Sequence, residues 1–174
     1  MYEPKELNVS MAIVAIDRDT NKINETLRHY YDFYTNYKKI LITNDLKFDY
    51  YNKGQEYDIY HSDSFQVLEN YDIALRNCKT EWCFLVQAGT YLTKHLIKKL
   101  SIFVLNEKDI IFPVKNRIYE FVKNPLNGLL INKNTYNKVG GFGKDNHLDI
   151  IKLSWGYNAS IEGCKLKAVV GIKI

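Results

Sequence analysis

Residues 70–92 of the chain are NYDIALRNCKTEWCFLVQAGTYL, and this stretch decides the fold. Its first part continues a helical pattern that begins near residue 64 and ends near residue 78. Its second part, WCFLV at residues 82–86, is a short apolar run typical of a strand covered on both faces. The polar residue Gln87 follows this run. A helix that leads directly into a buried strand indicates an α/β domain.

The same alternation of helix and strand extends towards the N-terminus. Two further apolar runs, VSMAIVAI at residues 9–16 and KILIT at residues 39–43, are predicted to be buried strands. Residues 23–37 between them carry apolar and aromatic side chains at helical spacing, and a short strand is predicted at residues 57–60. This order of elements predicts a mostly parallel sheet.

Shorter elements are predicted after this sheet. We expect helices at residues 93–106, 133–139 and 147–155, and strands at residues 109–114, 117–122, 128–131 and 167–172. Pro113 favours the end of its strand or an edge of the sheet, because proline cannot donate a ladder hydrogen bond. No internal repeat or linker is visible, so we expect one domain over residues 1–174.

Composition limits the classes of protein to which the chain can belong. The chain has 174 residues, of which 46% are hydrophobic, and a formal net charge of +4, as in an ordinary globular protein. No apolar run approaches the roughly 20 residues that span a bilayer, and residues 1–9 lack the pattern of a secretory signal. Three cysteines cannot all pair, which favours a reducing compartment. We therefore expect a cytoplasmic protein without a transmembrane segment.

Polar side chains follow three of the predicted strands. Asp17, Asp45 and Gln87 come at or just after the ends of the strands at residues 9–16, 39–43 and 82–86. In open α/β sheets, ligands bind beyond the carboxyl ends of the strands. The sequence therefore predicts one cleft that these three residues share, with the character of a nucleotide site.

In the order and spacing of these features, the chain resembles the family 2 glycosyltransferases, which have the GT-A fold. The resemblance covers residues 8–163 and has its strongest part at residues 70–92. It also includes the later motif VGGF at residues 139–142. It implies a three-layer α/β/α sandwich around a mostly parallel, Rossmann-like sheet, and a sugar donor attached to a nucleoside diphosphate, with a UDP-sugar expected.

The resemblance also implies roles for individual residues. Ala15, Asp17 and Asp45 would hold the base and ribose, because a carboxylate accepts hydrogen bonds from ribose hydroxyls or a base N–H. Asn70 and Arg76 would border the nucleotide and its diphosphate, where a guanidinium can hold phosphate oxygens. The alternative is structural: the two aspartates would cap the elements that follow them, and Arg76 would be a solvated helix residue.

The metal site of the family is missing. The family places Asp-x-Asp after the fourth strand to hold a divalent cation, whereas this chain has Gln87, Ala88 and Gly89. Magnesium and manganese prefer anionic oxygen ligands, so we assign no metal ligands, and Gln87 and Gly89 are instead expected beside the donor. Either catalysis has been lost, or basic side chains neutralise the diphosphate. The candidates are Arg76, Lys94, His95, Arg117 and Lys144.

The catalytic base is expected after the VGGF motif. The family has an acidic pair there, one member of which serves as base towards the acceptor hydroxyl. Asp149 is our candidate by its place before the IIKLSWGY stretch, with Asp145 as the second choice. A helix-capping carboxylate is the structural alternative for Asp149.

Three functions remain open from the sequence. The first is a hexosyltransferase-type enzyme that moves a sugar from a nucleotide-diphosphate donor to the hydroxyl of a glycan or another acceptor. The second is a non-catalytic relative that binds a nucleotide sugar or a partner protein. The third possibility, which applies to either class, is that the acceptor is a modified nucleic acid. Only the basic stretch at residues 115–123 supports it.

Overall fold

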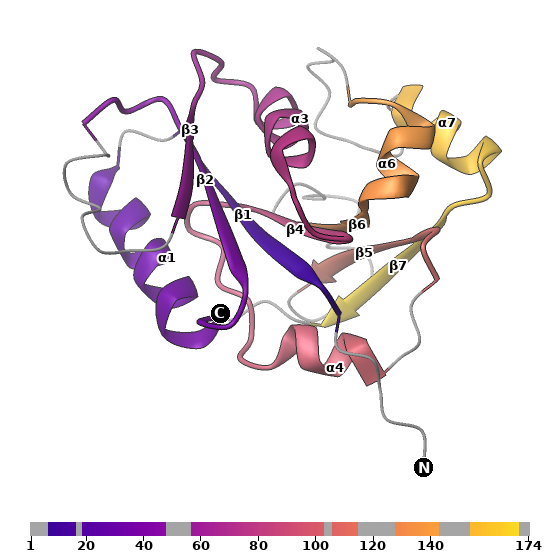
Figure 1. Ribbon diagram of the computed structural model, residues 1–174, viewed down its shortest axis with the longest axis horizontal. Coiled ribbons are helices and arrows are strands. Elements are labelled where there is room, and N and C mark those ends of the chain that lie inside the picture. Colours follow the sequence, from indigo (N-terminus) through magenta and orange to yellow (C-terminus); the bar gives the residue numbers. More distant parts are fainter. Residues whose placement is uncertain are drawn as a thin grey trace.

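The computed structural model describes residues 7–16, 19–47, 57–102, 106–114, 128–142 and 154–170. The predicted strand at residues 117–122 and most of the predicted helix at residues 147–155 lie outside these ranges. Within them, seven strands form one sheet in the order β3-β2-β1-β4-β6-β5-β7 (Figure 1).

The first four strands of this sheet are parallel. They are β1 (Val9–Ala15), β2 (Lys38–Thr43), β3 (Tyr57–His61) and β4 (Trp82–Gln87). β1 lies at the centre of this half, between β2 and β4. Every residue of β1 is buried, which explains why its sequence is apolar without alternation.

The other half of the sheet contains the reversed strand. β6 (Gly128–Asn132) runs antiparallel to both β4 and β5 (Asp109–Val114), and β5 pairs in parallel with β7 (Lys165–Val170). Pro113 stands next to the last residue of β5, as expected for a strand end. A Cβ atom at Gly128 would lie 2.8 Å from the Pro113 ring, so the glycine makes room for the proline.

Helices cover both faces of the sheet, as Figure 1 shows. One hydrophobic core joins the sheet to α1 (Thr20–Phe33) and α4 (Leu96–Ile102). The other joins it to α3 (Val67–Asn77), α6 (Lys133–Val139) and α7 (Ser154–Ile161). The fold is thus a three-layer α/β/α arrangement around a mostly parallel sheet, which confirms the predicted fold class.

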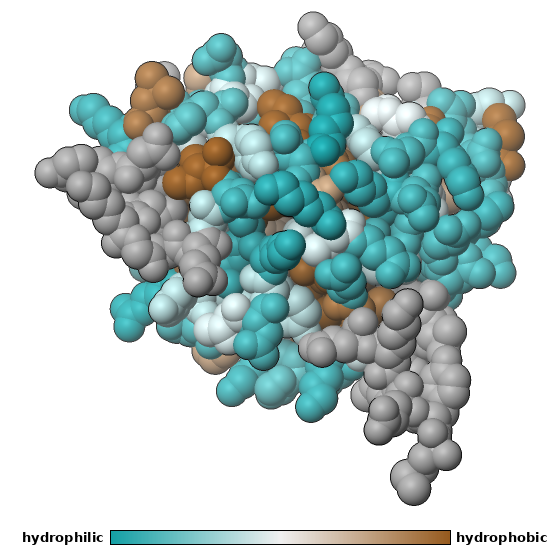
Figure 2. All heavy atoms as spheres, in the orientation of Figure 1, coloured by the Kyte–Doolittle hydropathy of each residue, from teal (hydrophilic) through white to brown (hydrophobic). Residues whose placement is uncertain are grey.

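The face drawn in Figure 2 is mostly hydrophilic, with apolar atoms in small separate groups. In the described part of the chain, no helix has both the length and the apolar character that crossing a membrane requires.

Most predicted elements are present, with shifts at their ends. The helix expected at residues 23–37 begins earlier, at Thr20, because the Asp19 side chain accepts hydrogen bonds from the N–H groups of Asn21 and Lys22 and so caps it. The helix therefore includes three residues, Thr20, Asn21 and Lys22, that precede its predicted start at residue 23. This shift places Lys22 in the first turn of α1 rather than in a loop.

A buried carboxylate ties the glycine motif at residues 140–142 to α3. Asp72 accepts hydrogen bonds from the Tyr136 hydroxyl, at 2.8 Å, and from the Phe142 N–H, at 2.9 Å. A Cβ atom at Gly141 would lie 3.1 Å from the Asp72 carboxylate, so a glycine allows this close approach. Burial raises the pKa of Tyr136, and its hydrogen bond to Asp72 adds to the rise.

We predict that Asp72→Ala lowers the free energy of unfolding by about 2–6 kcal/mol, because two buried donors lose their acceptor at about 1–3 kcal/mol each. Tyr136→Phe should cost less, since Asp72 keeps its bond to Phe142. Urea denaturation of both variants and the wild type measures the difference. Equal losses in the two variants would show that Asp72 does not hold the motif.

Candidate functional site

The ends of three parallel strands meet at one edge of the sheet. Ala15 at the end of β1 is paired with Thr43 of β2, and Val14 is paired with Gln87 of β4. The predicted convergence of these strand ends is therefore confirmed. Asp45 follows β2 and Gly89 follows β4, so both lie just beyond this edge.

The chain changes direction across the sheet at β1. After β1 it passes through α1 to β2 and β3 on one side of β1, and then through α3 to β4 on the other side. The two helices cover opposite faces of the sheet. Open α/β sheets bind ligands where the strand order reverses in this way, which here is the carboxyl end of β1 and β4.

One face of α1 holds the segment that follows β4. The Gly89 N–H donates to the Thr26 hydroxyl at 2.8 Å, and the Tyr30 hydroxyl donates to the Thr90 carbonyl at 2.9 Å. His29 lies 2.9 Å from the Leu92 carbonyl through Nε2, and Tyr34 donates to the Thr93 carbonyl at 2.6 Å. This segment stands where the family has its acidic motif, and α1 fixes its backbone.

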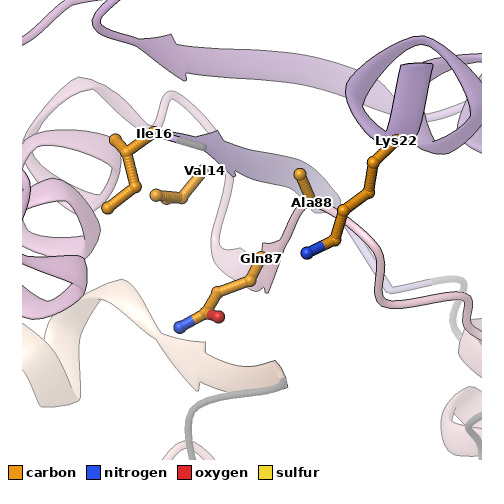
Figure 3. A pocket seen from close by; sticks show the side chains of 5 residues that line it. All are labelled: Val14, Ile16, Lys22, Gln87 and Ala88. Atoms are coloured by element: carbon orange, nitrogen blue, oxygen red, sulfur yellow. The ribbon is translucent and has the colours of Figure 1, made fainter. Parts of the chain in front are cut away.

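A pocket of about 250 Å³ opens at this place. Its lining comes from the end of β1, the end of β4 and the first turn of α1, with residues Val14, Ile16, Lys22, Gln87 and Ala88. Figure 3 shows the Lys22 ammonium beside Ala88 at the end of β4, while the Gln87 side chain extends away from Ala88. The pocket therefore presents an ammonium group and an amide.

The residues of this pocket do not fit a divalent metal. Gln87 offers one neutral amide oxygen, Gly89 has no side chain, and the Lys22 ammonium would repel a second cation. Among the residues that the structure describes, no three His, Cys, Asp or Glu side chains cluster as metal ligands would. Among the described lining residues, Lys22 is the one with a charged side chain.

Ala15 and Asp45 lie near the pocket without lining it. The Ala15 side chain is fully buried in the core beneath α1, so Ala15 could offer a ligand only its backbone. Asp45 is partly buried, and its Oδ1 accepts a hydrogen bond from the Lys47 N–H at 2.8 Å. One carboxylate oxygen thus closes a turn after β2. The described residues show no helix directly after this turn that Asp45 would cap.

Asn70 is buried, and its amide holds the loop that leads into α3. Its Nδ2 donates to the carbonyls of Ser64, at 2.9 Å, and Gln66, at 2.7 Å. Its Oδ1 is also buried and has no hydrogen-bond partner within the described residues. Asn70 can therefore influence a nucleotide through this loop rather than by direct contact.

The structure places Arg76 away from the pocket. It lies exposed in the last turn of α3, next to Cys78, whose thiol contacts the backbone at the start of β4. That is the edge of the sheet opposite to the pocket, because β4 ends at Gln87. In this position Arg76 does not contact the pocket where the diphosphate is expected, because the length of β4 separates Arg76 from the pocket.

Other expected basic side chains do not reach the pocket either. The Lys94 ammonium lies 5.6 Å from the ring centroid of Phe33, the last residue of α1, whereas the pocket is at the first turn of that helix. His95 is exposed just before α4. The remaining predicted site residues, Asp17, Arg117, Lys144, Asp145 and Asp149, lie outside the described residues.

Lys22 is the charged pocket residue that sequence reasoning missed. The helical pattern of apolar residues begins at Ile23, so the predicted helix does not include Lys22. The useful signal was Asp19, a residue type that commonly begins a helix, since a start at Thr20 puts Lys22 in a first turn that faces the strand ends.

Comparison with known proteins supports the fold and does not identify the protein. No protein family and no curated protein matches the chain by sequence. Among solved structures, the chain is similar to the mannosyltransferase PcManGT of Pyrobaculum calidifontis in complex with GDP-Man and Mn²⁺. The TM-score is 0.75 at 11% identity, over 97% of this chain and 56% of that one.

A second similar structure is S. aureus TarS 1–349 in complex with UDP-GlcNAc, with a TM-score of 0.67 at 12% identity over 94% of this chain and 57% of that one. A third is the bifunctional IspDF of Campylobacter jejuni, with a TM-score of 0.59 at 14% identity over 94% and 50% of the two chains. This chain thus spans 50–57% of the length of these three chains. At these identities the likeness shows the fold, which is the GT-A-like fold that the sequence resemblance implied.

We predict that Thr26→Val lowers the free energy of unfolding by about 1–3 kcal/mol, because the Gly89 N–H loses its acceptor inside the protein. Valine has nearly the shape of threonine and is also β-branched, so packing and helix preference change little. Thr35→Val, at an exposed position after α1, is the matched control. Urea denaturation measures both, and faster hydrogen exchange of the Gly89 amide should accompany the loss. Equal stabilities of the two variants would contradict the role of Thr26.

Proposed function

We propose that the chain is a nucleotide-sugar-dependent glycosyltransferase domain that works without a divalent metal, in a cytoplasmic protein. In this proposal residues 1–174 form one donor-binding unit, and the pocket at the ends of β1 and β4 receives the donor's phosphates. The observation that carries the proposal is the position of this pocket, at the point where the strand order reverses.

The chemistry of the pocket supports an anionic ligand. Lys22 brings a positive charge, and the Gln87 amide can donate a hydrogen bond to a phosphate oxygen. The volume of about 250 Å³ is below the roughly 300–1,000 Å³ of sites for drug-sized ligands, so it suits part of a nucleotide sugar. The rest of the donor would extend along the same edge of the sheet.

The neighbouring strand ends offer a place for the nucleoside. Asp45 follows β2, and Leu46 beside it is 76% exposed. Phe65, in the loop after the adjacent strand β3, is 66% exposed. An exposed aromatic ring can stack on a base, and the Asp45 carboxylate can accept hydrogen bonds from ribose hydroxyls.

The reaction would be a displacement at the anomeric carbon of the sugar. The acceptor oxygen forms a bond to that carbon, and the bond to the diphosphate oxygen breaks with its electron pair on the oxygen. The acceptor proton passes to a carboxylate base, for which Asp149 is our candidate and Asp145 the second choice. Positive charge beside the departing diphosphate lowers the barrier of this step.

A non-catalytic relative that binds a nucleotide sugar or a partner protein is the second candidate. The lack of acidic residues after β4 favours this candidate, because Gln87 and Gly89 stand where such an enzyme would have carboxylates that hold a metal. The hypothesis that the acceptor is a modified nucleic acid depends on residues 115–123, which lie outside the described part of the chain. The two assays below separate the enzyme from the binding protein.

We predict that Asp45→Ala weakens binding of the nucleoside diphosphate that the protein prefers by about 1.5–3 kcal/mol, the contribution of a hydrogen bond to a charged group. Isothermal calorimetry with UDP and GDP measures the change. Asp58→Ala is a matched carboxylate control and should bind like the wild type. Asp58 lies on β3 and forms an exposed ion pair with Lys79. Unchanged affinity in folded Asp45→Ala would remove Asp45 from the site.

We also predict that sugar transfer proceeds in EDTA at a rate within about twofold of that with manganese, because the described residues of the pocket provide no anionic metal ligand. A donor panel of UDP-, GDP-, CMP- and TDP-sugars, assayed under both conditions, tests this. In the active pair, Asp149→Asn should reduce the rate by about 10²–10⁴-fold, the usual contribution of a positioned base. Strong manganese dependence would contradict the metal-free proposal. Donor binding without turnover would favour the non-catalytic relative.

A further inference from the structure

The Lys22 side chain packs directly against Gly89, a contact that the donor-binding proposal alone does not require. A Cβ atom built at Gly89 would overlap Lys22 Cε and would lie 3.3 Å from its ammonium nitrogen. The backbone at Gly89 has a φ of +89°, which side-chain-bearing residues rarely adopt. Because residue 89 has no side chain, the Lys22 side chain can lie directly against it at the end of β4.

Two hydrogen bonds fix the backbone under this lysine. The Thr26 hydroxyl donates to the Lys22 carbonyl at 2.7 Å and accepts from the Gly89 N–H at 2.8 Å. Thr26 is fully buried, so it joins the first turn of α1 to the segment after β4 at a constant distance. The backbones of Lys22 and Gly89 are thereby held close together, and the Lys22 side chain lines the pocket (Figure 3).

We propose that the Lys22 ammonium is a built-in cation that binds the diphosphate of the donor at the place where a metal-dependent enzyme of this fold would hold its ion. The inference rests on the proposed function for the identity of the ligand. In the family that the chain resembles, a carboxylate is expected near this position, whereas Gly89 leaves space that the Lys22 side chain occupies.

The amide groups at the start of α1 do not supply this charge. Asp19 already accepts from the N–H groups of Asn21 and Lys22, both at 3.1 Å, so these two donors are used within the protein. The cationic group in the pocket is the lysine side chain. Its single charge on a flexible stem binds phosphate oxygens through up to three N–H donors.

A lysine in place of a divalent ion changes what the site can do. One positive charge stabilises a departing diphosphate less than two charges at the same distance. Binding should therefore be insensitive to chelators, and it should weaken with salt because the pocket is open to solvent. Removing the ammonium should affect phosphate-bearing ligands and leave a bare nucleoside unaffected.

The experiment compares Lys22→Gln with the wild type in EDTA, by calorimetry with UDP, GDP, the matching nucleosides and inorganic pyrophosphate. Lys22→Gln should weaken the preferred nucleoside diphosphate and pyrophosphate by roughly 10–100-fold, as expected for a lost charge-assisted hydrogen bond. Binding of the nucleoside should not change. Lys22→Arg should keep most of the affinity, and Lys98→Gln, which removes an exposed charge from α4, is the matched control.

Gly89→Ala provides a second test that keeps the net charge. Its Cβ atom would displace the Lys22 stem, so diphosphate and pyrophosphate affinity should fall although the lysine is still present. Circular dichroism and a thermal melt establish that this variant is folded.

The outcomes separate the two proposals. Wild-type affinity for pyrophosphate and nucleoside diphosphate in Lys22→Gln overturns the role of Lys22, and so does wild-type binding that requires manganese. In the first case, nucleotide binding by the wild type would leave the donor-binding proposal intact. In the second case, donor binding would stand, but the metal-free part of the proposed function would fail with the role of Lys22. If the wild type binds pyrophosphate through Lys22 but no nucleotide, the anion site stands and the donor-binding proposal fails. A wild type that binds neither probe contradicts both.

Discussion

The hydrogen bonds between one face of α1 and the segment after β4 determine the rest of the site. Thr26, His29, Tyr30 and Tyr34 each contact a backbone group of residues 89–93. Each neutral hydrogen bond contributes about 0.5–1.5 kcal/mol. Their common effect is geometric, because they fix the first turn of α1 relative to the end of β4. The pocket and its lysine exist only because these two elements are held together.

This constraint relates the sequence to the chemistry. In the enzymes that the chain resembles, the segment after the fourth strand carries carboxylates for a metal ion. Here the same backbone position carries a glycine, and α1 supplies a cation from the other side of the pocket. In our proposal, the positive charge beside the diphosphate comes from this lysine and not from a metal ion. The likeness to glycosyltransferase structures at 11–12% identity concerns the fold alone.

The strands were predictable because burial on both faces requires continuous apolar runs. β4 and β5 begin and end within one residue of the runs at residues 82–86 and 109–114. Helix ends were less predictable, because α1 starts at a cap and the apolar pattern does not show the first turn. The edge of the sheet where the site lies followed from the polar strand ends. Arg76 and Lys22 could not be placed from sequence, because the register of a helix against the sheet decides which end of the strands each residue approaches.

The central claim is that a lysine, and not a metal ion, stands beside the diphosphate at the end of β4. The most direct measurement is a crystal structure with the bound nucleoside diphosphate, grown with manganese and measured at the manganese absorption edge. The account predicts a phosphate oxygen within hydrogen-bond distance of Lys22 Nζ and no anomalous peak between the diphosphate and Gln87. A manganese peak at Gln87, with Lys22 turned away from the phosphates, would contradict it.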